Sequence, residues 1–390
     1  RPHGFSLHLD LRCGGEGVKL RGRTLPAASV VFRRSGATAF QALQRFFKEL
    51  CPVPLLPDHP VYGSNNWYYA YGNSSHQDIL QDADYLASLT QGLETSHMVI
   101  DDGWQSLHNM EPGYNGGPWR AGNEKFPDRG LAREIANRGA RPGIWIRLLW
   151  NRDPQIPESW RSKRDREYLD PTVPEVLSYI QEDLRTLRRW GYELIKHDFS
   201  TYDIFGRWGF QMGSQITGGG WRFADETVTA LSVLNFYKAV REPPVAGDPG
   251  LQLHPATWRG LMHLNRTGDD TSGRSWEQTR KMGSEHPLFL PAPARRLFAI
   301  DADCVGVTGE IPWELNRQWL QLLAESGTPL FTSIQPACSP QSRRKGAGRL
   351  RHGFPAQQRW GYPLDWQNNM YPESWLLSHR KETFRWYLDR

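Results

Sequence analysis

The sequence predicts an α/β fold in which residues 60–335 form a (β/α)8 TIM barrel. Short apolar segments of strand length recur along this stretch, and most are separated by segments with helical periodicity. The eight strand candidates are residues 67–72, 97–102, 141–149, 192–199, 251–254, 260–266, 297–307 and 328–334. The alternative is an open doubly wound sheet, which is disfavoured because no glycine-rich phosphate loop follows any candidate strand.

Helix start and stop signals support the connecting segments. Ser75 and Asp78 have the spacing of a capping box ahead of an apolar stripe. Pro174 is placed for the first turn of a second helix, and Gly191 and Gly327 follow two helical segments as stop residues.

The barrel is expected to be the middle of three parts. Residues 1–59 contain the strand-like segments SLHLDL and SVVFRR, a helix over 38–51 and a proline-rich connector, so they predict a partial β-rich segment. Residues 336–390 are expected to form a loop and then an aromatic, charged helical tail packed on the barrel.

Composition narrows the class of protein. The net charge is +5, from 47 basic and 42 acidic residues, and the basic cluster at 343–351 is typical of a solvated loop, so no nucleic-acid partner is expected. The four cysteines have neither disulfide-framework nor zinc spacing, and we expect no metal and no cofactor. No apolar run approaches ~18 residues, so no membrane span is expected. The chain begins without Met or a signal-peptide core, as expected of a fragment or processed form. The sequence does not predict the cellular compartment of the protein. A homo-oligomer is possible.

Acidic residues follow several of the predicted strands, at the end of a barrel where active sites gather. They are Asp101 and Asp102, Asp198, Asp269 and Asp270, and Asp301 and Asp303. Cleavage of a glycosidic bond needs one carboxylate at the anomeric centre and another that protonates the leaving oxygen. The chain also has 17 Trp residues, whose flat rings can stack on sugars. A single Asp at a strand end can merely cap a helix, but the set together predicts glycoside hydrolysis.

The motifs around these residues carry a family resemblance. The segments SNNWYYAYG, VIDDGWQ, RPGIWIR, ELIKHDFS and RTGDDTSGRSW resemble those of melibiase-type α-galactosidases, the clan D glycoside hydrolases of families 36 and 27. The resemblance covers about residues 60–335 and implies a carbohydrate substrate, an α-galactoside. It also implies that the N-terminal strands are the end of an incomplete β-sandwich.

The resemblance implies a role for each matching residue. Asp198 becomes the nucleophile of a retaining mechanism and Asp270 the general acid/base, with Asp269 as the alternative because the doubled Asp leaves the match uncertain by one position. Substrate contacts are implied for Asp101 and Asp102 at the 4-OH and 6-OH, for Lys196 and Arg266 as donors, and for Trp67, Trp104 and Trp145 as pocket walls.

Strand geometry agrees with these roles. Lys196 lies two residues before Asp198, so both side chains point to one face and the ammonium favours an ionised nucleophile. His197 is expected to point to the helices. Asp270 is expected to have the raised pKa, because a general acid must hold its proton near neutral pH.

One segment departs from the family pattern. Residues 242–259 show no Cys- or Gly-containing turn for the 2-position of the sugar, which leaves galactose against N-acetylgalactosamine open. Two further alternatives are a transglycosylase of the raffinose-synthase kind and a catalytically impaired carbohydrate-binding barrel. A metal-dependent hydrolase using Asp101, Asp102 and His97 is disfavoured, since His97 begins its strand at the far end of the barrel.

Overall fold

The computed structural model describes most of the chain. The described residues are 9, 11–26, 28–108, 113–127, 129–206, 219–241, 251–254, 261–266, 268–285, 296–335 and 361–387, with only the backbone described for 251–254 and 282–285. Most of SLHLDL, the basic cluster at 343–351 and most of 242–259 lie outside these residues.

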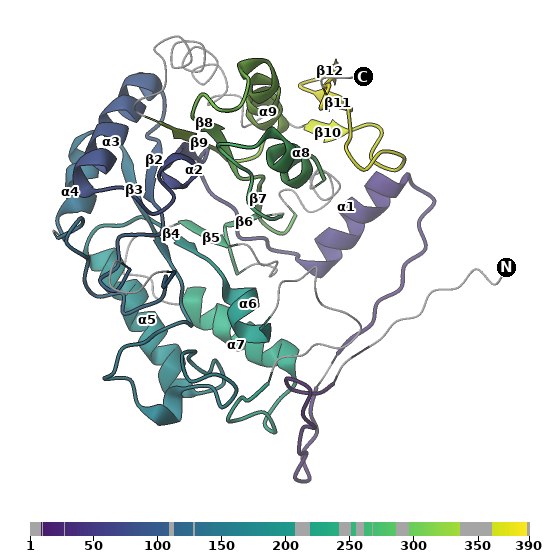
Figure 1. Cartoon of the computed structure of the whole chain (residues 1–390). Coiled ribbons are helices and arrows are strands. Elements are labelled where there is room, and N and C mark those ends of the chain that lie inside the picture. The colour runs from purple at the N-terminus through teal and green to yellow at the C-terminus, as the bar shows by residue number, and fades with distance from the viewer. Residues whose placement is uncertain are drawn as a thin grey trace.

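Nine parallel strands form the central sheet (Figure 1). They are β1 (Tyr62–Asn65), β2 (His97–Ile100), β3 (Arg141–Ile146), β4 (Leu194–His197), β5 (Leu251–His254), β6 (Leu264–Arg266), β7 (Ala299–Asp301), β8 (Cys304–Val307) and β9 (Leu330–Ile334). The pairing order runs β7-β6-β5-β4-β3-β2-β1-β9-β8. Only Ala302 and Asp303 separate β7 from β8, so these two are halves of one broken strand, which joins β6 on one side to β9 on the other. The ring is thereby closed with eight barrel strands, as predicted, and the open sheet is excluded.

Helices connect and surround the strands. They are α1 (Ala39–Leu50), α2 (Trp67–Ala70), α3 (His76–Thr90), α4 (Leu131–Asn137), α5 (Pro174–Arg189), α6 (Ser200–Phe205), α7 (Thr229–Arg241), α8 (Trp276–Glu285) and α9 (Trp313–Ser326), with a 3-10 turn at Glu158–Trp160. The capping box at Ser75 and Asp78 is present, Pro174 begins α5, and Gly327 ends α9 in the left-handed conformation. The predicted helix start and stop residues are confirmed, because such caps depend on residues close to one another in the sequence.

The first barrel strand lies earlier than predicted. Residues 67–72 were expected to be the strand, but β1 ends at Asn65 and Trp67 begins α2. The Asn65 carboxamide accepts the Trp67 N–H at 2.8 Å, and the Asn66 carboxamide accepts the Asp101 N–H at 2.7 Å. These side-chain bonds to backbone turn the chain out of the strand, and this overrides the strand propensity of the aromatic run.

The described part of the predicted N-terminal β-rich segment forms no strand. Within the described part of residues 1–37, pairing is limited to an isolated bridge between Cys13 and Glu16. Residues 29–34 belong to no strand, and Val31 and Phe32 are exposed. β-branched residues favour a strand only when a neighbouring strand supplies the hydrogen bonds.

The predicted helical tail is wrong in its described part. Residues 361–387 form an antiparallel sheet of β10 (Gly361–Pro363), β11 (Ser374–Leu377) and β12 (Arg380–Thr383). Ser378 and His379 join β11 to β12 with φ of 48° and 71°, the backbone of a tight hairpin turn. Trp375 and Trp386 are fully buried in one cluster with α9, so this sheet packs on the barrel as the tail was expected to do.

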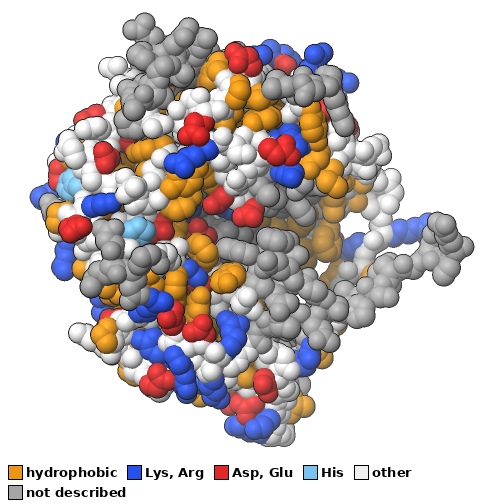
Figure 2. Space-filling view, viewed as in Figure 1, with side chains coloured by type: hydrophobic (Ala, Val, Ile, Leu, Met, Phe, Trp, Pro, Cys, Tyr) orange, Lys and Arg blue, Asp and Glu red, His pale blue; other side chains and the backbone are white. Residues whose placement is uncertain are grey.

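The surface is mixed in charge. Figure 2 shows Lys and Arg interspersed with Asp and Glu on the face in view, so its coloured side chains form no large area of a single sign. Among the described residues, no helix combines the length and apolar composition needed to cross a membrane.

Candidate active site

The ends of β1, β2 and β4 meet at a buried carboxylate. Asp101, directly after β2, accepts hydrogen bonds through Oδ2 from Lys196 Nζ and from Asn65 Nδ2, both at 2.6 Å. All three side chains are buried. An ion pair this short and this enclosed fixes the direction of the Lys196 ammonium. The Lys196 pKa is raised because the charges of Asp101 and then Asp198 outweigh the opposing effect of burial.

Asp198 follows β4 on the same face as Lys196. Its Oδ2 accepts the indole N–H of Trp145 at 3.2 Å, and its Oδ1 accepts the backbone N–H of Phe199 at 2.7 Å. Phe199 has a φ of 60°, a left-handed conformation that non-glycine residues seldom adopt outside functional sites. The carboxylate is thus half-buried and held at both oxygens.

His197 points the other way, as predicted. It is fully buried, its Nδ1 lies 3.3 Å from Ser200 Oγ, and its ring lies 6.0 Å from that of Tyr237 on α7. It therefore belongs to the layer between strand and helices.

Arg266, the last residue of β6, organises the other carboxylates. Its Nη2 donates to Asp270 Oδ1 at 3.1 Å and to Asp303 Oδ2 at 2.8 Å. Asp303 lies in the break between β7 and β8 with a φ of 75°, and it also accepts from the Tyr68 hydroxyl and from Thr271. Asp303 therefore holds the guanidinium beside Asp270.

The two candidate catalytic carboxylates have shifted pKa values in opposite directions. Burial raises the pKa of Asp198, Lys196 opposes the shift, and the charge of Asp270 adds to it. Burial would also raise the pKa of Asp270, but Arg266 and then Lys196 lower it below its ordinary value. The expectation that Asp270 carries the raised pKa is therefore wrong, because no local sequence pattern indicates how closely Arg266 approaches this carboxylate.

The neighbouring acidic residues differ in exposure. Asp269 is exposed, its carboxylate accepts the Asp270 N–H at 3.0 Å, and its carbonyl accepts from Arg266. Asp102 is buried and accepts from Gln105 Nε2 at 2.7 Å. Asp269 therefore serves as a turn residue.

The three predicted tryptophans have different positions. Trp145 is buried and contacts Asp198 directly, and Trp67 is partly buried at the start of α2 instead of on a strand. Trp104, the third residue predicted to wall the pocket, is buried to a similar degree as Trp145. Its ring is buried against Trp119 and Trp190, and its indole N–H donates to the Trp145 carbonyl at 2.8 Å. An indole needs a partner for its N–H when buried, and Trp104 finds one beneath the site.

Sequence reasoning missed several site residues. Asn65 and Tyr68 lie in the aromatic motif SNNWYYAYG, but the misplaced first strand assigned that motif to the wrong element. Asp303 was predicted to lie at the end of a strand, but no role at the site was predicted for it. Its role depends on Arg266, 37 positions away, and no local pattern indicates such a contact.

A second buried ion pair connects the segments that follow β3 and β4. Arg147, directly after β3, binds both carboxylate oxygens of Asp203 on α6 at 2.6–3.1 Å, and both side chains are buried. The guanidinium also lies 4.1 Å from the ring centroid of Phe199, the residue that donates its N–H to Asp198. Arg147 thereby joins the segments after β3 and β4.

Replacing Arg147 by Met should destabilise the protein by about 3–5 kcal/mol at pH 7, because a buried Asp203 charge is left unpaired. Burial, opposed by Arg147, already raises the Asp203 pKa to about 6, and loss of the guanidinium raises it further. The deficit should shrink as pH falls from 7 to 5, since Asp203 can then bind a proton. Urea unfolding at both pH values measures this.

The matched control is Arg189→Met, which breaks the exposed pair with Glu182. It should cost less than about 1 kcal/mol at either pH. An equal loss in the two variants would show that Arg147 is not the structural link inferred here.

The chain has the (β/α)8 barrel fold of solved α-galactosidases. The α-galactosidase of Thermus thermophilus, solved with p-nitrophenyl α-D-galactopyranoside, matches with a TM-score of 0.62 and 19% identity over 88% of this chain and 70% of that one. α-Galactosidase I of Mortierella vinacea matches at 0.54 and 17% over 82% and 77%, and the Geobacillus stearothermophilus β-L-arabinopyranosidase at 0.53 and 17% over 78% and 77%. No family model and no curated relative matches the sequence.

Proposed function

We propose that this protein is a retaining glycoside hydrolase that cleaves terminal α-galactosides by double displacement. The observation that carries the proposal is the pair Asp198 and Asp270, which follow β4 and β6. The buried ammonium of Lys196 acts on both carboxylates, and the buried guanidinium of Arg266 acts on Asp270. Each carboxylate is held by directed hydrogen bonds, as a nucleophile and a general acid require.

The proposed reaction has two steps. The shifted pKa values favour the pair's single proton on Asp198, so substrate binding must first move it to Asp270. A carboxylate oxygen of the ionised Asp198 then attacks the anomeric carbon while Asp270 gives its proton to the departing glycosidic oxygen. Asp270 then removes a proton from water, which attacks the anomeric carbon and releases Asp198. A retaining site should hold the two carboxyl groups ~5–5.5 Å apart in the complex with substrate. Asp270 is favoured over Asp269 because it is the one bound by Arg266 through its carboxylate.

Sugar recognition is assigned to the ends of β1, β2 and β4. Asp101 and Asp102 are the proposed acceptors for the 4-OH and 6-OH of galactose, and Trp145 and Trp67 the apolar surfaces beside the ring. The α-galactosidases and the arabinopyranosidase of the same fold support this choice. β-L-Arabinopyranose has the ring configuration of α-galactose without the hydroxymethyl group.

Hydrolysis of nitrophenyl glycosides tests the proposal. The α-galactoside should be cleaved with kcat/KM at least about tenfold above the α-glucoside and the α-N-acetylgalactosaminide, because one misplaced or extra group costs ~1–3 kcal/mol in a fitted pocket. The β-L-arabinopyranoside tests whether the 6-OH contributes. Preference for the N-acetyl sugar would establish the alternative that segment 242–259 leaves open. Cleavage of none would favour a non-catalytic binding barrel.

A second assay compares transfer of galactose to water with transfer to an acceptor sugar. With raffinose alone, a hydrolase releases free galactose at the rate at which raffinose disappears. A raffinose-synthase-like transglycosylase would instead transfer galactose to an added acceptor sugar faster than it releases free galactose. Product analysis by chromatography with and without acceptor separates the two.

The pH profile of kcat/KM should be bell-shaped, with its optimum on the acidic side of neutrality. The reaction needs one proton on the carboxylate pair. Below the lowered pKa both groups are protonated and no nucleophile exists, whereas above the raised pKa both are ionised and no acid exists. A profile that keeps rising with pH through neutrality would contradict the assignment of the pair.

A further inference from the structure

The Tyr68 hydroxyl lies among the groups that control the proposed general acid. Tyr68 belongs to α2, just after the turn that ends β1, and its side chain is fully buried. Its hydroxyl donates to Oδ2 of Asp303. Arg266 Nη2 donates to the same oxygen at 2.8 Å, and the N–H and hydroxyl of Thr271 do so at 2.7 and 2.9 Å. Four donors therefore converge on one carboxylate oxygen.

One carboxylate oxygen cannot serve four donors equally well. Each oxygen of a carboxylate offers about two lone pairs, so a donor that can turn gains from a second acceptor. A phenol O–H turns about its C–O bond, and Asp270 is within its reach. Arg266 and then Lys196 lower the Asp270 pKa most, against the effect of burial, and a hydrogen bond from Tyr68 lowers it further.

Close packing fixes Tyr68 beside the loop that carries Asp270. A Cβ on Gly273, three residues after Asp270, would lie 2.0 Å from the Tyr68 carbonyl oxygen, so only glycine allows this approach. A Cβ on Gly306 of β8 would in turn lie 2.5 Å from the Gly273 Cα. The phenol ring is thus held in place, and only its O–H is free to turn.

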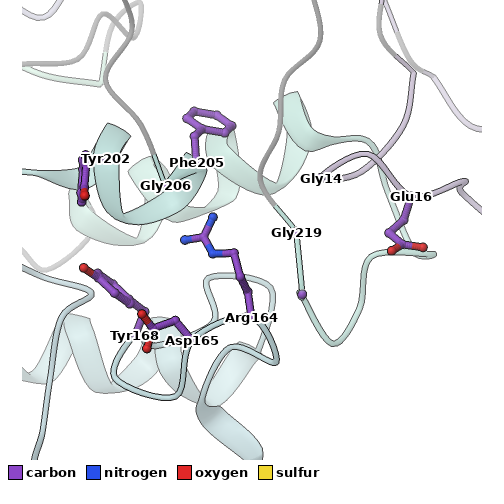
Figure 3. A pocket seen from close by; sticks show the side chains of 10 residues that line it. Gly14, Glu16, Arg164, Asp165, Tyr168, Tyr202, Phe205, Gly206 and Gly219 are labelled. Carbon is purple, nitrogen blue, oxygen red and sulfur yellow. The ribbon is translucent and has the colours of Figure 1, made fainter. Parts of the chain in front are cut away.

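The enclosed position of Tyr68 distinguishes it from tyrosines at open sites. Tyr168 and Tyr202 line a pocket of about 610 Å³ beside α6 (Figure 3). In such a pocket, water can replace a hydroxyl that is removed. Tyr68 is fully buried, so water cannot take the place of its O–H, and a loss of this donor should be felt by both carboxylates.

We propose that Tyr68 is a positioning residue for Asp270. Its O–H turns to Asp270 when this carboxylate is ionised, and to Asp303 when Asp270 holds the proton. The inference rests on the proposed function, in which Asp270 gains and loses a proton in each reaction cycle. Burial and the charges of Asp270 and Asp303 raise the Tyr68 pKa, so the hydroxyl stays protonated and remains a donor throughout.

The surrounding charges determine the expected direction of each effect. The titratable and charged groups that face this hydroxyl and Asp270 are Lys196, Asp198, Arg266, Asp301, Asp303 and Cys304, on or directly after β4, β6, β7 and β8. The Tyr68 O–H stabilises ionised Asp270, whereas the negative charge of Asp303 disfavours that ionisation and shares Arg266 with it. Removing the hydroxyl should therefore raise the Asp270 pKa, and neutralising Asp303 should lower it.

The test compares the pH profiles of kcat/KM for the wild type, Tyr68→Phe and Asp303→Asn. The acidic limb reports the first ionisation of the pair, which belongs mainly to Asp270 because its pKa is the lower one. Tyr68→Phe should move this limb to higher pH by at least about 0.5, and Asp303→Asn should move it to lower pH by a similar amount. All four donors end on Oδ2 of Asp303, so the asparagine oxygen can still accept them.

Tyr69→Phe is the matched control, because this neighbouring hydroxyl also donates to a buried carboxylate, that of Asp82 in α3. It should leave the acidic limb in place. A merely structural role of Tyr68 would lower stability or rate without moving the limb. An unchanged limb in Tyr68→Phe, or a shift in the same direction in Tyr68→Phe and Asp303→Asn, would overturn the proposal.

Carbon-13 NMR of protein labelled at its aspartate carboxyl carbons follows the ionisation of Asp270 without any substrate. The Asp270 signal is identified by its loss in Asp270→Asn, and its midpoint should rise in Tyr68→Phe, fall in Asp303→Asn and stay unchanged in Tyr69→Phe. If these shifts occur while no glycoside is hydrolysed, the proposed function fails and the contact of Tyr68 with Asp270 stands. If glycosides are hydrolysed while the Asp270 signal does not respond to Tyr68→Phe, the role of Tyr68 fails and the hydrolase stands.

Discussion

Replacement of Asp198 by Ala is expected to reduce kcat for nitrophenyl α-galactoside by at least about 10⁴-fold, the scale on which hydrolases respond to loss of their nucleophile. The change removes the oxygen that attacks the anomeric carbon and leaves a small space beside Trp145 and Phe199. Azide should enter that space, restore part of the rate and give the β-galactosyl azide. Release of nitrophenolate with and without azide, and the anomeric form of the azide product, are the measurements.

The wild-type protein provides the stereochemical control. Two successive displacements at the anomeric carbon restore its configuration, so the first sugar released from an α-galactoside should be the α-anomer. Proton NMR of the fresh reaction mixture distinguishes the anomers before they interconvert. Release of the β-anomer, or a substantial residual rate in Asp198→Ala without azide, would remove Asp198 from the role of nucleophile.

Replacement of Asp270 by Ala should depend strongly on the leaving group. Hydrolysis of raffinose should fall by about 10²–10⁴-fold, the usual contribution of a general acid, because a sugar alkoxide leaves only when protonated. Dinitrophenyl α-galactoside has a leaving group that needs little protonation, so its first step should be nearly preserved. A burst of dinitrophenolate, followed by slow turnover through the unassisted second step, is the expected trace.

Asp269→Ala is the matched control for this variant. Asp269 is adjacent and exposed, and among the described residues its hydrogen bonds are with Asp270 and Arg266. Its loss should change kcat/KM less than about threefold on either substrate, within the range of surface substitutions. If Asp269→Ala showed the leaving-group dependence and Asp270→Ala did not, the two assignments would have to be exchanged.

The order of the barrel strands could be predicted from the sequence because it depends on local pattern. Even the weak candidate at 251–254 is a strand, paired with β4 and β6. Parallel barrel strands are buried on both faces and form short apolar runs, and the residue after such a run lies at the end of the barrel where sites form. Asp101, Asp198 and Asp270 were located by that rule together with the motifs.

Other features depended on contacts between distant segments, which a linear pattern does not contain. The tail was predicted as a helix, but pairing of β10, β11 and β12 satisfied its backbone as a sheet. Trp104 was assigned to the pocket wall by the family resemblance, whereas its contacts with the Trp145 carbonyl and the Trp119 ring could not be predicted from the sequence.

Local sequence pattern was sufficient to predict the fold class, the position of the strand-end carboxylates and the shared face of Lys196 and Asp198. The pKa shifts of these carboxylates depend on contacts that form only in the folded chain. Asp303, placed in the break between β7 and β8, holds Arg266 against Asp270, and this lowers the pKa that the sequence predicted to be raised. A pKa depends on burial and on charges within a few ångströms, and those distances are set only when the ring of strands closes.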